Sequence, residues 1–174
     1  MTSQSKTVLF IVAPDDFQDE EYFIPRQILE EKGHQILTSS TLEQAVSKSG
    51  KTIDTDRLLG LINEAEADAI VFVGGSGCQK YFAMKKSHQI AAGYLEEGKI
   101  VGAICSAVSI LANTGILQDV KVTGYKDEKK NILKQGGNYT GEEVEVDGLI
   151  ITARDAEASQ AFGEAIAQAL EGDK

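Results

Sequence analysis

Three short and almost continuous apolar runs constrain the fold of this chain more than any other feature. They occupy residues 7–13, 69–73 and 100–104 and are rich in β-branched side chains. Runs of this length without polar alternation are typical of strands that are buried on both faces. Helical patterns separate them, such as residues 20–32, for which Gly33 is the expected C-terminal cap. Strands that alternate with helices predict an α/β fold with a mostly parallel central sheet.

Weaker patterns predict the remaining elements. A second strand is expected at residues 34–39 and another at 120–124, and Asp147-Gly148 predicts a hairpin turn between two further strands. Pro25 either kinks the first helix or lies in its first turn. The polar residues 46–52 form either a hairpin or an exposed loop. Further helices are expected at residues 57–63, 79–84, 87–97, 126–134 and 156–170.

Size and charge exclude several classes of protein. A chain of 174 residues suits a single domain, here residues 1–174. The formal net charge of -10 argues against nucleic acid or an anionic membrane as a partner. No apolar stretch is long enough to span a bilayer, and the N-terminus has no cleavage-site pattern of a signal peptide. Two cysteines are too few for a disulfide framework, so a reducing, cytoplasmic location is expected.

Cys105 directly follows the apolar run 100–104 and precedes a helical pattern. A buried strand that turns sharply into a helix would hold the thiol at the bend, facing the free N–H groups of the helix. The helix dipole favours a thiolate at that position. The same arrangement positions the nucleophile in the elbow of hydrolases. The alternative is that Cys105 is only a small buried apolar residue.

Two other features follow predicted strands and fall at the same edge of the sheet. Gly74 and Gly75 follow the run 69–73, and the acids Asp19, Glu20 and Glu21 follow the first strand. Ligands of open α/β sheets bind at the carboxyl ends of the strands. The glycines either offer N–H donors to an oxyanion or simply make a tight turn. One acid could relay a proton to the thiol, but the residue types alone do not select among the three, which are also favourable helix N-terminal acids.

The other candidate side chains fit structural roles better. His34 begins a strand and His88 lies in a polar helix, and neither is next to Cys105 in the sequence. No residues have the spacing of zinc ligands, so neither a metal nor a cofactor is expected. Cys78 follows the glycine turn; it is either a resolving cysteine for Cys105 or, as the more frequent use of cysteine, a buried small residue.

Four segments together resemble the DJ-1/PfpI superfamily. They are FQDEEYFIP at residues 17–25, DAIVFVGGSG at 68–77, AICSAVSILANTGIL at 103–117 and GGNYTGEEVEVDGLIITAR at 136–154. The resemblance extends from about residue 8 to residue 170. It implies a flavodoxin-like three-layer sandwich that assembles into homodimers or larger homo-oligomers.

The resemblance also implies the residues of the site. The nucleophile is Cys105, and the carboxylate four residues before Pro25, Glu21, hydrogen-bonds it. Gly75 and Ser106 supply backbone N–H groups to an oxyanion. The chain departs from the family at two places where relatives have a histidine: Ser106 follows the nucleophile, and Tyr125 stands after the strand at 120–124. A tyrosine donates a hydrogen bond but is a poor base near neutral pH.

Three functions follow from these residues. The first is a cysteine-dependent enzyme for small reactive carbonyls or their adducts, similar to glyoxalases and deglycases, in which Glu21 relays the proton. The second is a redox sensor or stress protein without catalysis, in which Cys105 is oxidised. The third is an intracellular peptidase or amidase of the PfpI type, which the missing histidine disfavours.

Overall fold

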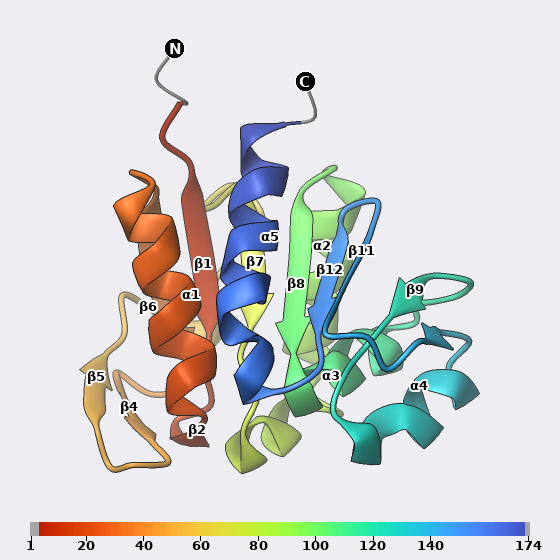
Figure 1. The fold of residues 1–174 in the computed structure, drawn as a ribbon. Coiled ribbons are helices and arrows are strands. Elements are labelled where there is room, and N and C mark those ends of the chain that lie inside the picture. The colour runs from red at the N-terminus through yellow and green to blue at the C-terminus, as the bar shows by residue number, and fades with distance from the viewer. Residues whose placement is uncertain (1–3, 173–174) are drawn as a thin grey trace.

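The computed structural model describes residues 4–172 and contains a central sheet of seven strands (Figure 1). The strand order is β11-β12-β8-β7-β1-β3-β6. All neighbouring strands are parallel except β11 and β12, which pair antiparallel around the predicted Asp147-Gly148 turn. The strand bounds are β1 Thr7–Ile11, β3 Gln35–Ser40, β6 Arg57–Leu58, β7 Ala69–Phe72, β8 Ile100–Ile104, β11 Val144–Asp147 and β12 Ile150–Ala153.

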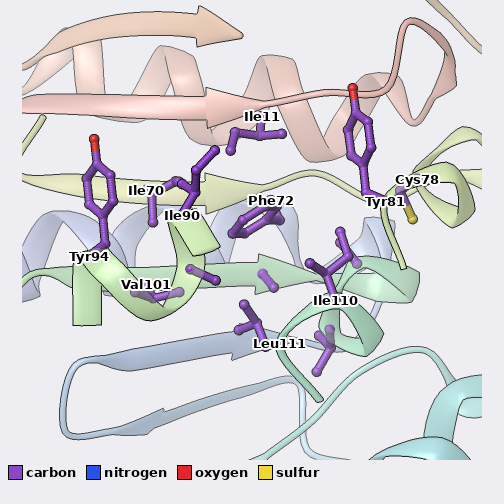
Figure 2. Packing of buried hydrophobic residues seen from close by; sticks show 14 of the residues in the cluster. Ile11, Ile70, Phe72, Cys78, Tyr81, Ile90, Tyr94, Val101, Ile110 and Leu111 are labelled. Carbon is purple, nitrogen blue, oxygen red and sulfur yellow. The ribbon is translucent and has the colours of Figure 1, made fainter. Parts of the chain in front are cut away.

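Helices cover both faces of this sheet, which confirms the three-layer α/β sandwich. Helices α1 (Asp19–Glu31) and α5 (Ser159–Glu171) pack side by side on one face, whereas α2 (Lys85–Glu96) and α3 (Val108–Thr114) lie on the other (Figure 1). The core is therefore divided into two apolar clusters. In β1, Leu9 and Ile11 belong to the cluster beneath α2 and α3, part of which Figure 2 shows, and Val8 and Phe10 belong to the other. Burial of alternate residues on opposite faces explains why the strand sequence is apolar throughout.

The packing of α1 against α5 places the first helix of the site. Pro25 lies in the second turn of α1 and not in its first turn, and α1 continues to Glu31. A Cβ atom on Gly163 of α5 would lie 2.9 Å from the Cα atom of Pro25. The two helices therefore approach closely because glycine stands opposite proline.

Smaller elements differ in part from the sequence-based expectations. Residues 57–63 do not form the expected helix: they contribute β6, which pairs with β3, followed by the 3₁₀ helix Leu59–Leu61. The strand expected at 120–124 is shorter and pairs outside the main sheet, as β9 (Lys121–Val122) with β10 (Asn138–Tyr139). The polar segment around residues 46–52 is a hairpin. It comprises β4 (Gln44–Ser47) and β5 (Thr52–Asp54) and joins β2 (Asp15–Phe17) in a small sheet.

The helix expected at residues 79–84 is instead the 3₁₀ helix Ser76–Tyr81, which ends before residue 84. The helices expected at residues 87–97, 126–134 and 156–170 are present, and the last two begin with short 3₁₀ segments. Within residues 4–172 no helix has both the length and the apolar character needed to cross a membrane. The remaining bounds are α4 Lys129–Lys134 and the 3₁₀ helices Ser76–Tyr81, Cys105–Ala107, Lys126–Glu128 and Ala156–Ala158.

Candidate active site

The carboxyl ends of three adjacent strands, β1, β7 and β8, bring the predicted site residues to one cavity. Its volume is about 380 Å³. All five candidate residues line it: Glu21, Gly75, Cys105, Ser106 and Tyr125. The residues that the sequence predicts at one edge of the sheet therefore lie together around one cavity. The other lining residues are Gln18, Lys48, Ser76, Gln79, Asp155 and Ala156.

Cys105 occupies a strained bend between β8 and α3. Its φ angle is 60°, in the left-handed region that residues other than glycine rarely adopt. The 3₁₀ helix Cys105–Ala107 follows directly and leads into α3. The Tyr125 N–H donates to the Cys105 carbonyl oxygen over 3.1 Å, which holds the bend from the neighbouring loop. The strand-to-helix turn thus projects a half-buried thiol into the cavity, as an elbow would.

Glu21 is the only one of the three acids that faces the thiol. Its side chain is buried, with 1% of the residue exposed, and neither carboxyl oxygen has a conventional hydrogen-bond partner among the described residues. Burial raises the pKa of Glu21 to about 8, against the opposing effects of the Cys105 thiol and the Gly74 N–H. The charges of Glu20 and Asp155 raise it further. Glu21 is therefore protonated near neutral pH and has a proton to donate.

The other two acids of the first turn of α1 are engaged elsewhere. Asp19 accepts hydrogen bonds from the hydroxyl groups of Ser47, over 2.7 Å, and Ser49, over 2.6 Å. Glu20 is exposed and accepts a hydrogen bond from the side-chain amide of Gln18 over 2.6 Å. The helix thus directs three successive acids to a loop, to solvent and to the thiol.

The glycine pair is required by close packing around the site. A Cβ atom on Gly74 would lie 2.5 Å from Oε2 of Glu21 and 2.8 Å from Cβ of Cys105. Gly75 has a φ angle of 106°, and its Cβ would lie 2.5 Å from the Asp16 carbonyl oxygen. Among residues 4–172 nothing accepts the Gly75 N–H, so this donor is available at the cavity wall. The turn at Gly74 and Gly75 is thus tight and also leaves the Gly75 N–H free to donate a hydrogen bond.

The Cys105 thiol and the Glu21 carboxyl influence one another. Burial raises the pKa of Cys105 to about 12, and the charge and hydrogen bond of Glu21 raise it further, whereas the Ser106 hydroxyl and N–H oppose the rise. The two effects of Glu21 on the thiol depend on whether Glu21 carries its proton. Since a protonated carboxyl carries no charge and can donate to sulfur, the pair titrates as a coupled unit. The chemistry that this arrangement offers is attack by sulfur with a proton donor beside it.

The remaining sequence candidates lie outside the cavity. The His34 ring accepts the Lys6 N–H over 3.2 Å, and the His88 ring meets the Phe82 carbonyl oxygen over 2.8 Å. Cys78 is a free, fully buried member of the cluster beneath α2 and α3 (Figure 2), and burial raises the pKa of its thiol. No group of three potential ligands among the described His, Cys, Asp and Glu side chains could hold a metal ion.

Sequence reasoning missed five polar residues of the cavity: Gln18, Lys48, Ser76, Gln79 and Asp155. Asp155 follows the second strand of the predicted hairpin, but the sequence did not show that this strand pairs with the strand before Cys105, so Asp155 could not be assigned to the same edge. Lys48 had no usable signal, since it lies in the turn of a hairpin whose approach to the cavity depends on the pairing of β4 with β2.

A strained cysteine at the end of a parallel strand, with a buried carboxyl and a glycine turn beside it, defines an α/β protein of the nucleophile-elbow class. Residues 6–169 match the model of the DJ-1/PfpI family, and the chain belongs to this family. An uncharacterized protein of Methanocaldococcus jannaschii is 33% identical over 94% of this chain and 82% of its own length. A deglycase of Pyrococcus abyssi is 31% identical over 84% of this chain and 89% of its own.

A solved structure gives the same result for the fold. The ThiJ/PfpI domain protein of Brachyspira murdochii superposes with a TM-score of 0.94 and is 33% identical. The match covers 97% of this chain and 98% of the other.

Proposed function

We propose that this protein is a cysteine-dependent enzyme that converts small reactive carbonyl compounds or their adducts, in the manner of a glyoxalase or deglycase. The observation that carries the proposal is the Cys105 thiol beside the buried Glu21 carboxyl, whose raised pKa keeps a proton available at neutral pH. The names of relatives as deglycases support the same class of substrate.

Methylglyoxal illustrates the reaction that these groups would perform. The Cys105 thiol loses its proton to water, and its sulfur attacks the aldehyde carbon. The carbonyl electron pair moves to oxygen, and the N–H groups of Gly75 and Ser106 bind the oxyanion. Glu21 gives its proton to that oxygen, which yields a hemithioacetal. The Glu21 carboxylate then removes the hydrogen on the former aldehyde carbon while water protonates the ketone oxygen, which gives an enediol. Glu21 returns its proton to the adjacent carbon, and the hydroxyl on the former aldehyde carbon loses its proton to water, which leaves a thioester of lactate. Water hydrolyses the thioester to lactate and the free thiol, so no external oxidant is consumed.

The positions of the two histidines favour this reaction over peptide hydrolysis. A cysteine peptidase needs a general base next to the thiol, most often histidine. His34 and His88 are both bonded to backbone groups away from the cavity. Carbonyl addition needs only the sulfur of Cys105 and a proton relay, for which Glu21 is placed. Burial raises the pKa of the thiol, against the expected effect of the helix dipole, so the thiol must lose its proton as the substrate is attacked.

The test compares matched variants in methylglyoxal consumption, with the product identified as lactate. Cys105→Ser should abolish lactate formation. Glu21→Gln should lower the rate by roughly 100-fold or more, the usual contribution of a positioned acid or base. Glu20→Gln, which changes an exposed carboxyl one residue away, should retain the wild-type rate. Loss of thiol without lactate, or equal effects of both glutamate variants, would overturn the proposal and favour redox sensing through Cys105.

A further inference from the structure

Asp155 is a cavity residue that the proposed reaction does not use. It follows β12, whose last residue, Ala153, pairs with Ile104 of β8. Because Cys105 comes directly after Ile104, the parallel pairing brings Asp155 to the same edge of the sheet as the thiol. Asp155 accordingly lines the cavity.

The bonding of the Asp155 carboxylate is incomplete. Its Oδ2 atom accepts a hydrogen bond from Nε of Arg154 over 2.8 Å, but Oδ1 is shielded from solvent and has no partner among the described residues. Asp155 also stands at the N-cap of the 3₁₀ helix Ala156–Ala158, where an aspartate usually accepts a helix N–H, yet its side chain makes no such bond. A buried oxygen without a partner is costly and points to a purpose other than stability.

Arg154 forms an ion pair with Oδ2 of Asp155 and offsets part of its charge, but Arg154 does not line the cavity and leaves Oδ1 without a partner among the described residues. The charged groups that line the cavity do not cancel the remaining charge near the thiol. Glu21 is neutral while it holds its proton. Lys48 is the one cation among the lining residues, and it is exposed in the turn between β4 and β5, so water and salt screen it. The Asp155 side chain is only 29% exposed, and its charge acts on Glu21, next to the reacting sulfur.

We propose that Asp155 sets the charge selectivity of the cavity. It favours carbonyl compounds that carry an ammonium or another cationic group near the reacting carbon, and it disfavours those that carry a carboxylate. The carbonyl part of this inference rests on the proposed function, whereas the preference for cations applies to any reagent that reaches Cys105.

Charged thiol reagents test this preference without any carbonyl turnover. Aminoethyl, methyl and sulfonatoethyl methanethiosulfonate are cationic, neutral and anionic and share one leaving group. In each case the Cys105 thiolate attacks the sulfenyl sulfur, a mixed disulfide forms and methanesulfinate leaves. The ratio of the cationic to the anionic rate constant, taken on one protein at one pH, cancels the fraction of thiolate. Cys105→Ser identifies the reacting thiol.

Asp155→Asn should lower the cation-to-anion ratio by about threefold or more, because charges a few ångströms apart near a protein surface interact by at least this factor. Lys48→Gln should raise the ratio by less than Asp155→Asn lowers it, because Lys48 lines the cavity but is exposed and screened by water. Glu157→Gln, a nearby exposed carboxyl that does not line the cavity, should leave the ratio unchanged and so controls for the net negative charge of the protein. An unchanged ratio in Asp155→Asn, or an equal change in Glu157→Gln, would overturn the proposal.

The wild-type protein provides a second measurement that does not depend on the folding of a variant. Its cation-to-anion ratio should exceed that of free cysteine and should fall toward it as salt is raised to about 1 M, where the screening length is roughly 3 Å. A wild-type ratio equal to or below that of free cysteine would contradict a role of Asp155 in selectivity.

Discussion

At the scale of single residues, burial alone gives neighbouring carboxyl groups of one helix turn different chemistry. Glu20 is exposed, whereas Glu21 is buried against the elbow and has its pKa raised to about 8. Successive helix residues differ in direction by about 100°. The sequence could therefore predict an acid near the thiol but could not select Glu21 from the residue types alone, because the choice depends on how α1 is rotated against the sheet. The resemblance to relatives made that choice, and the structure places Glu21 in the cavity.

The raised pKa of Glu21 predicts how stability depends on pH. Between the ordinary pKa of 4.5 and about 8, the unfolded chain loses this proton and the folded chain keeps it. The folded state then binds more protons, so the free energy of unfolding falls as pH rises through that window, by up to about 1.4 kcal/mol per pH unit. Glu21→Gln should remove this slope. Urea unfolding of both proteins across the window measures it, and parallel curves for the two proteins would contradict the assignment.

The close packing around Gly74 predicts that a larger side chain there would reduce both stability and activity. Gly74→Ala would place a methyl group 2.8 Å from both Cβ of Cys105 and the Ile104 carbonyl oxygen, so the elbow must shift. We expect a loss of about 1–3 kcal/mol in unfolding free energy, the usual cost of overpacking, together with loss of carbonyl turnover. Gly60→Ala is the matched control, because its Cβ would meet nothing within 4 Å. Similar stability and turnover in the two variants would show that the close approach at Gly74 is unimportant.

At the scale of elements, the strands of the core and the hairpin of β11 and β12 were predictable, whereas β6 at the opposite edge of the sheet was not. The continuous apolar runs of β1, β7 and β8 predict strands correctly because both faces of each strand are buried. Residues 57–63 misled the prediction because their local pattern is helical, whereas Arg57 and Leu58 pair with Ser39 and Ser40 of β3. Such pairing depends on neighbours distant in sequence, which local propensity does not contain.

Two helical glycines should respond differently to replacement by alanine, because only Gly163 lies at the contact between α1 and α5. Gly163→Ala would force a methyl group against the Cα atom of Pro25 and the Cδ1 atom of Ile28, so it should destabilise the fold by about 1 kcal/mol or more. Gly93→Ala in α2 meets only the flexible side chain of Glu64, so it should be neutral or stabilising through helix propensity. Thermal unfolding of both variants checks this, and equal melting temperatures would contradict the account of the helix contact.

At the scale of the whole molecule, strand order assembles a site from distant parts of the sequence. Glu21, Gly75 and Cys105 follow β1, β7 and β8, which are neighbours in the sheet although helices and loops separate them along the chain. The alternation of strands and helices predicts this convergence because parallel strands share one carboxyl edge. It does not predict Lys48 or Asp155, whose places depend on the pairing of β4 with β2 and of β12 with β8.

The most direct test of the central claim is the number of lactate molecules formed per Cys105 thiol in one time course with excess methylglyoxal. We expect many lactates per thiol in the wild-type protein, with the thiol recovered at the end, and none in Cys105→Ser. One equivalent or less of methylglyoxal consumed, with the thiol lost and no lactate formed, would contradict the claim that Cys105 and Glu21 form a catalytic pair.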